Sequence, residues 1–174
     1  MRIRIALVTL LLVLIPVGMA MAQQPVNLYD TLAAAGNYKT FLSLVDKGNV
    51  QELKSMQGPF TVFAPTDAAF ANVPQATLDK IMGDPAIVRD VVYFHITPGK
   101  YLVKDLPALR ECKTMCPTEN AGVMKFNKIS GKYMVSEATI VQPDMLATNG
   151  VAQGINAVML PNLPLQRISN KRGI

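Results

Sequence analysis

Residues 60–70 read Phe60-Thr61-Val62-Phe63-Ala64-Pro65-Thr66-Asp67-Ala68-Ala69-Phe70. The first half is rich in β-branched and aromatic residues and lies between prolines at positions 59 and 65, which predicts a β-strand over residues 60–64. Thr66 is placed to cap a following helix, and Asp67 suits the positive end of that helix. We therefore expect a short strand that passes directly into a helix ending near Asn72.

Helical patterns lie on both sides of this stretch. Asn27 is placed to cap a first helix, and Gly36 and Gly48 are placed to end the first and second helices. In the second helix, apolar residues recur three and four positions apart, at Tyr38, Phe41, Leu42 and Val45. We expect helices over residues 27–35, 38–47, 74–83 and 85–91, and a strand over residues 93–97.

After about residue 100 the pattern becomes extended. Ser130-Gly131 signals a tight turn between two of the expected strands. These strands cover residues 101–103, 123–129, 132–135, 138–142 and 151–159. Helices in the first half and strands in the second half favour an α+β domain with mostly antiparallel or mixed pairing over repeated βαβ units.

The first 22 residues have the layout of a secretory signal peptide. Arg2 and Arg4 precede an apolar run that is closed by Ala20-Met21-Ala22, and we expect cleavage after Ala22. The alternative, a membrane anchor helix, needs about twenty apolar residues, whereas this run has about eleven. We therefore expect a secreted or periplasmic protein without a membrane span, with a single domain over residues 23–162 and a basic tail over 163–174.

The charge balance argues against one class of partner. The whole chain has 17 Lys and Arg against 12 Asp and Glu, but the body from Gln23 to Gln166 is balanced at 12 against 12. A nucleic-acid-binding domain needs basic residues concentrated on one face, usually with aromatic residues between them. We expect no nucleic acid among the partners, and we expect the chain to be a monomer.

Two longer strings and several short ones occur in a fixed order along the chain. Residues 61–70 resemble the first signature of fasciclin-like domains, and the second is similar to Ala147-Thr148-Asn149-Gly150-Val151 with Val158-Met159-Leu160-Pro161. Between them, matching strings are Leu78-Asp79-Lys80, Asp84-Pro85, Phe94-His95 and Pro98-Gly99-Lys100-Tyr101. The resemblance covers roughly residues 26–162, nearly the whole expected mature chain.

The resemblance implies a fold and a class of function. The fold is an α+β, wedge-shaped β-sandwich of about seven strands with helices packed along one edge. Fasciclin-like domains are extracellular or periplasmic modules of cell adhesion and protein binding, and they are not enzymes as a class. The implied partner is another protein or a cell-surface component, and no cofactor is expected.

Two dipeptides that are tied to adhesion in this family mark candidate contacts. The family's Tyr-His pair corresponds to Phe94-His95, and its Asp-Ile pair corresponds to Asp144-Met145. The resemblance therefore implies that Phe94, His95, Asp144 and Met145 bind the partner. His95 has a second interpretation, as a hydrogen-bonded interior histidine, because no Ser, Cys or carboxylate near it in the sequence suggests a catalytic triad.

Cys112 and Cys116 are the two cysteines of the chain. In an oxidising compartment their spacing predicts a disulfide that closes a short loop, without a bound metal. Two cysteines separated by three residues and followed by proline also resemble the copper-binding string of cytochrome oxidase assembly chaperones, with further ligands conceivable at His95, Met115 and Met124. Periplasmic copper handling through Cys112 and Cys116 is therefore the alternative function, and reactive or unpaired thiols are a third interpretation.

Overall fold

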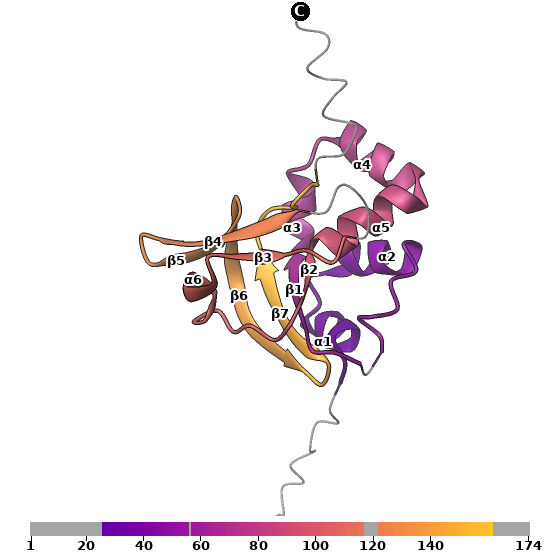
Figure 1. Ribbon diagram of the computed structural model, residues 1–174. Helices are drawn as coiled ribbons and strands as arrows, with labels where there is room; N and C mark the ends of the chain where they lie inside the picture. Colours follow the sequence, from indigo (N-terminus) through magenta and orange to yellow (C-terminus); the bar gives the residue numbers. More distant parts are fainter. Residues whose placement is uncertain (1–25, 56, 117–121, 162–174) are drawn as a thin grey trace, which may run out of the picture.

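The computed structural model describes residues 26–55, 57–116 and 122–161 (Figure 1). Its helices are α1 (Leu28–Ala35), α2 (Lys39–Lys47), α3 (Asp67–Ala71), α4 (Gln75–Gly83), α5 (Pro85–Phe94) and α6 (Leu106–Leu109). Its strands are β1 (Phe60–Pro65), β2 (Ile96–Pro98), β3 (Glu111–Lys113), β4 (Val123–Ile129), β5 (Lys132–Val135), β6 (Ala138–Ala147) and β7 (Gly150–Ile155). The expected signal peptide over 1–22 and the expected tail over 163–174 lie outside the described residues.

The seven strands form one mixed sheet in the order β2-β1-β7-β6-β5-β4-β3. β1 runs parallel to β7, and every other neighbouring pair is antiparallel. The two edge strands approach each other, because the Thr97 hydroxyl donates to Lys113 O at 2.7 Å and the Met115 N–H donates to Ile96 O at 2.8 Å. The sheet is therefore folded nearly closed, and the predicted α+β class with about seven strands is confirmed.

The folded sheet separates two apolar cores. Val62 and Ala64 of β1, with Ala152 of β7, belong to the helix-side core, which they share with buried side chains of α1, α2, α4 and α5. Phe63 and Ile155, which alternate with them along the strands, face the strand-side core and meet Leu106, Met124, Phe126, Val135, Ala138 and Met159. Helices α1, α2, α4 and α5 consequently lie together along one side of the sheet (Figure 1).

The capping signals act largely as predicted. Asn27 Oδ1 accepts a hydrogen bond from Asp30 N–H at 2.9 Å, and Thr66 Oγ1 accepts one from Ala69 N–H at 3.2 Å. Asp67 lies in the first turn of α3, as expected, and its carboxylate also accepts from Thr40 N–H at 2.8 Å and so caps α2 from outside that helix. The segment around residues 60–70 thus starts α3 and holds the beginning of α2 as well.

Parts of the predicted element map are wrong. The strand expected over 93–97 is the last turn of α5, with His95 as its C-cap, and β2 begins only at Ile96. No strand forms over 101–103, whereas α6 and β3 were not predicted. Within the described ranges, no helix is long and apolar enough to cross a membrane.

Candidate functional site

His95 lies wholly inside the protein, at the junction of α5 and β2. Its exposed fraction is 0%, and its ring packs edge-on against Phe41 with 5.8 Å between the ring centroids. Its main-chain carbonyl accepts from Phe63 N–H at 2.9 Å, which ties the end of the helix to β1. Because its side chain has no exposed surface, the expected direct contact between His95 and a partner is not available in this structure.

Both ring nitrogens of His95 are engaged. Nδ1 lies 2.7 Å from Val91 O, which can only accept, and Nε2 lies 3.0 Å from Met159 N, whose N–H donates. The proton therefore sits on Nδ1, and the ring is neutral. Burial lowers the pKa of His95 to about 4, against which the hydrogen bond to Val91 works. His95 is thus the interior histidine of the second interpretation, and it has no free nitrogen for a proton transfer or a metal.

Phe94 borders a cleft of about 480 Å³, which we call the Phe94 cleft. Its walls come from the end of α5, from the turn between β5 and β6 and from the segment after β7, and consist of Phe94, Ser136, Glu137, Ala138, Ala157, Val158, Met159 and Leu160. The half-buried Phe94 ring packs so closely on Gly122 that a Cβ there would lie 2.7 Å from the ring. The bond from Met159 to His95 fixes one wall to α5, and Glu137 is the charged side chain of the lining.

Asp144 and Met145 lie elsewhere, on β6. One oxygen of Asp144, Oδ1, accepts from Val103 N–H and from the Gln153 side-chain amide, each at 2.8 Å. Gln153 is fully buried and also accepts from Asp144 N–H at 2.8 Å. Met145 is half-buried and packs against the helix-side core. The structure therefore does not bring the two dipeptides into one site, because neither residue of the second pair borders the Phe94 cleft.

The expected disulfide between Cys112 and Cys116 is not formed in the structure. Cys112 of β3 pairs with Met124 of β4. The chain after Cys112 stays extended, because Thr114 N–H donates to Gly122 O at 3.0 Å and Met115 N–H donates to Ile96 O of β2. Four residues of extended chain span about 13 Å, whereas a disulfide needs Cα atoms less than about 7 Å apart. β3, which the sequence did not predict, and the extended residues that follow it therefore hold the two thiols apart.

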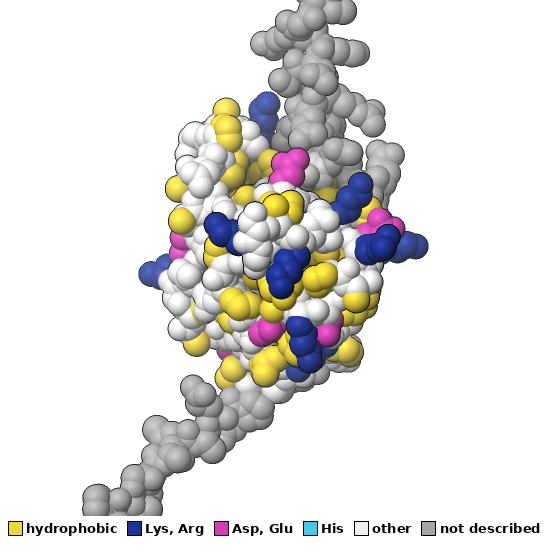
Figure 2. Space-filling view, turned by 90° about the vertical axis from the view of Figure 1, so that its left-hand side faces the viewer, with side chains coloured by type: hydrophobic (Ala, Val, Ile, Leu, Met, Phe, Trp, Pro, Cys, Tyr) yellow, Lys and Arg dark blue, Asp and Glu magenta, His cyan; other side chains and the backbone are white. Residues whose placement is uncertain are grey.

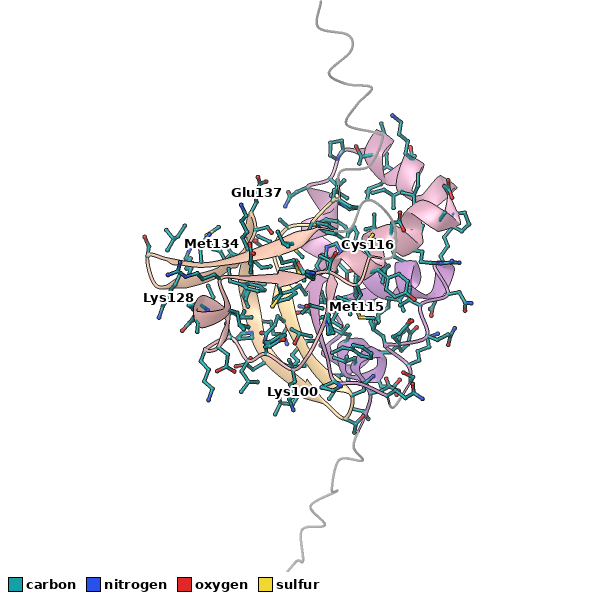
Figure 3. All side chains as sticks on the ribbon, viewed as in Figure 1. Lys100, Met115, Cys116, Lys128, Met134 and Glu137 are labelled. Carbon is teal, nitrogen blue, oxygen red and sulfur yellow. The ribbon has the colours of Figure 1, made fainter. Side chains whose placement is uncertain are left out.

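The geometry gives no support to copper handling. Burial raises the pKa of the Cys112 thiol, which disfavours the thiolate that binds metal. Met124 is fully buried in the strand-side core, whereas Met115 packs against the helix-side core, and Cys116 is buried on the same side as the helices (Figure 3). Across the part of the chain that the structure describes, no three His, Cys, Asp or Glu side chains are grouped so that they could hold a metal ion.

Comparison with known proteins decides the family. A model of the Fasciclin domain matches residues 36–161. The chain belongs to the Fasciclin domain family. Protein sll1483 of Synechocystis sp. is 33% identical to this fasciclin domain over 133 residues, which cover 74% of this chain and 71% of that protein. Immunogenic protein MPT70 of Mycobacterium tuberculosis is 24% identical, with 84% of this chain and 69% of MPT70 covered.

Two animal relatives share the domain within longer chains. Human periostin is 24% identical over 78% of this chain, which corresponds to 16% of periostin. The solved structure of a FAS1 domain pair from the insect cell adhesion molecule fasciclin I superposes with a TM-score of 0.64 at 17% identity, over 78% of this chain and 51% of that one. This superposition supports the fasciclin fold expected from the sequence, with strands on one side and helices along the other.

The walls of the Phe94 cleft were missed by sequence reasoning. Ser136 and Glu137 form the turn before β6, Ala138 begins β6, and residues 157–160 follow β7, so no chemical pattern links them in the sequence. The second fasciclin signature overlaps this wall at Val158-Met159-Leu160, and Met159 is the residue that His95 holds. That overlap is the one signal that could have pointed from the family motif to the cleft.

Proposed function

We propose that this fasciclin domain is an exported, non-catalytic module of the adhesion type that binds another protein or a cell-surface component. The observation that carries the proposal is the Phe94 cleft, an opening of about 480 Å³ whose walls expose both polar and apolar surface and carry one acidic side chain, Glu137. Cavities of this size suit the side chains or terminal groups of a ligand. Export is expected from residues 1–22, and the absence of a free nitrogen on His95 argues against acid-base catalysis.

The four residues that the resemblance marks take different roles in this proposal. Phe94 contacts the partner, together with Val158 and Leu160, which are half-buried in the cleft wall. His95 is a positioning residue, since it holds Met159 and thereby the wall. Asp144 and Met145 stabilise β6 and contribute to binding only through the fold. The cleft then fits a partner group that has both apolar and polar atoms, with a basic atom facing Glu137.

Site-specific photo-crosslinking on native cell envelopes tests the proposal. A photoreactive side chain at Ser136 in the cleft wall should give a discrete adduct with one partner, whereas the same side chain at Ala34, exposed on α1, should not. Glu137→Lys should weaken the adduct at position 136, because it reverses the charge offered to the partner. The same adducts from both positions, or none from Ser136, would contradict binding at the cleft.

A further inference from the structure

The β4–β5 hairpin carries an apolar tip between lysines. Its turn residues Ser130 and Gly131 have φ values of 50° and 81°, the positive values of a tight two-residue hairpin turn. Ile129, the last residue of β4, keeps 57% of its surface exposed, and Lys128 and Lys132 are also exposed. The hairpin extends away from helices α1 to α5 and beyond the rest of the sheet (Figure 1).

The two faces of this tip carry different groups. Ile129 lies directly opposite Lys132, so these side chains share one face, and Lys128 lies opposite Tyr133 on the other face. Lys128 Nζ lies 4.7 Å from the centroid of the Tyr133 ring and 3.3 Å from its hydroxyl oxygen. An apolar tip surrounded by ammonium groups and a phenol matches the boundary of a bilayer, where acyl chains meet phosphates.

More cations continue from the tip onto the body of the domain. Seven Lys and Arg but only three Asp and Glu lie in segments 97–116 and 122–139. The other described residues include five Lys and Arg and eight Asp and Glu. Arg110, Lys125 and Lys128 line a recess of about 440 Å³ in which Glu111 is the acidic residue. In the described part of the chain the one ion pair joins Lys54 to Asp46, so the hairpin cations are not neutralised there.

Figure 2 views the molecule from the side on which the hairpin projects. Lys and Arg side chains recur across this face with apolar side chains between them, while acidic groups are fewer (Figure 2). In Figure 3, Lys128 lies far from helices α1 to α5, towards the free end of the hairpin. Charge and exposed apolar surface therefore coincide on the part of the domain that protrudes most.

We propose that the β4–β5 hairpin docks this domain on an anionic lipid bilayer, with Ile129 entering the headgroup boundary and the neighbouring cations facing lipid phosphates. A bilayer suits this surface better than an acidic protein, because the apolar group stands on a projecting tip, whereas a protein partner must match about 800 Å² of surface closely. Each cation near an anionic lipid surface contributes about fivefold in affinity. The hairpin is separate from the Phe94 cleft, so docking leaves that cleft open to its own partner.

A single introduced indole reports insertion directly. The chain contains no tryptophan, so Ile129→Trp creates a unique fluorophore at the tip, and Met82→Trp creates one at a 36% exposed position on α4 as the matched control. With vesicles rich in phosphatidylglycerol, we expect a blue shift and quenching by brominated acyl chains for Ile129→Trp and neither for Met82→Trp. Vesicles of pure phosphatidylcholine should give no shift with either variant. No blue shift of Ile129→Trp on phosphatidylglycerol vesicles would overturn the proposal.

Charge variants in the full chain separate the hairpin from other basic segments. The double variant Lys128→Gln with Lys132→Gln should bind phosphatidylglycerol vesicles roughly thirtyfold more weakly than the wild type. The control is the double variant Lys47→Gln with Lys80→Gln, whose lysines are exposed on α2 and α4. Its binding should change less than about twofold. Equal losses in both double variants would overturn docking through the hairpin. Retention on immobilised polyglutamate without vesicle binding would assign the surface to an acidic protein and likewise overturn the lipid proposal.

Discussion

At the scale of the single residue, burial decides the charge of His95. Its pKa is lowered to about 4 in the folded state, against about 6.5 in an unfolded chain. Between these two pH values the unfolded chain binds a proton at His95 that the folded protein does not bind. The stabilisation that His95 gives the folded state is therefore complete above about pH 6.5. As the pH falls to about 4, the free energy of unfolding decreases by about 3 kcal/mol. NMR titration of the chain's one histidine should give a midpoint far below 6.5. A midpoint near 6.5 in the folded protein would contradict the buried, neutral ring.

The variant His95→Gln isolates the same effect in stability measurements. Carboxylates titrate in both proteins, so the difference between their urea unfolding curves at pH 7 and at pH 4.5 reports His95 alone. We expect the wild type to lose more stability than the variant over this interval. An identical loss in both proteins would show that His95 does not couple folding to protons.

Asn149 explains why the second fasciclin signature contains an amide. Its side chain is 1% exposed and accepts from Leu28 N–H at 2.8 Å, while its Nδ2 donates to the carbonyls of Glu52, Leu53 and Ser55 at 3.2, 3.3 and 2.6 Å. Asn149→Ala leaves these main-chain groups without the partner and should destabilise the domain by about 3 kcal/mol in urea unfolding. Asn127→Ala, at an exposed position on β4, is the control and should change stability by less than about 0.5 kcal/mol.

At the scale of the element, the parallel pairing of β1 with β7 depends on the close approach at Gly150. Gly150 has φ 156° and stands opposite Phe60, and a Cβ at this position would collide with the Phe60 carbonyl oxygen. Gly150→Ala should therefore push the two strands apart and destabilise the domain by about 2 kcal/mol or more. Gly83→Ala on α4 is the matched control, because no atom lies within 4 Å of its added Cβ, and it should be neutral or slightly stabilising by thermal unfolding.

Elements with local signals were predictable, and elements held by distant contacts were not. β1 begins directly after Pro59 and ends at Pro65, and Thr66 caps α3, so neighbouring residues specify both elements. The end of α5 reads as a strand because its residues favour extended structure, yet Val91 and Val92 are buried in the helix-side core and His95 bonds back to Val91 O. Packing thus overrides local propensity at this helix end.

The candidate site, too, was predictable only where a local sequence motif marked its residues. Phe94 was found through its place in a family dipeptide, but its neighbours in the cleft come from a turn and from the segment after β7. His95 is held by Met159, 64 residues further along the chain, and Asp144 is bonded to Val103, 41 residues before it. No local sequence pattern encodes contacts over such separations. Motif similarity located these residues in the sequence without determining which of them reach the surface.

At the scale of the whole molecule, a balanced composition conceals a separation of charge. The body has equal numbers of acidic and basic residues, yet the fold gathers most of the cations around β3, β4 and β5 and most of the carboxylates among the helices. Attraction between these two ends is screened at physiological ionic strength, with a Debye length of about 8 Å. The separation therefore affects which surface meets a charged partner more than it affects the stability of the domain.

The two cores should nevertheless unfold together. β1 and β7 contribute side chains to both cores, and the contacts between β2 and β3 close the sheet around the strand-side core. Leu32→Ala, which opens a cavity in the helix-side core, should destabilise the domain by about 3 kcal/mol. It should also move the urea midpoint for alkylation of Cys112 and Cys116 by the same amount as the midpoint of the helical circular-dichroism signal. Met82→Ala, at an exposed position on α4, should leave both midpoints unchanged. Loss of the helical signal while Cys112, which packs against the strand-side core, stays protected would show instead that the strand half folds independently of the helices.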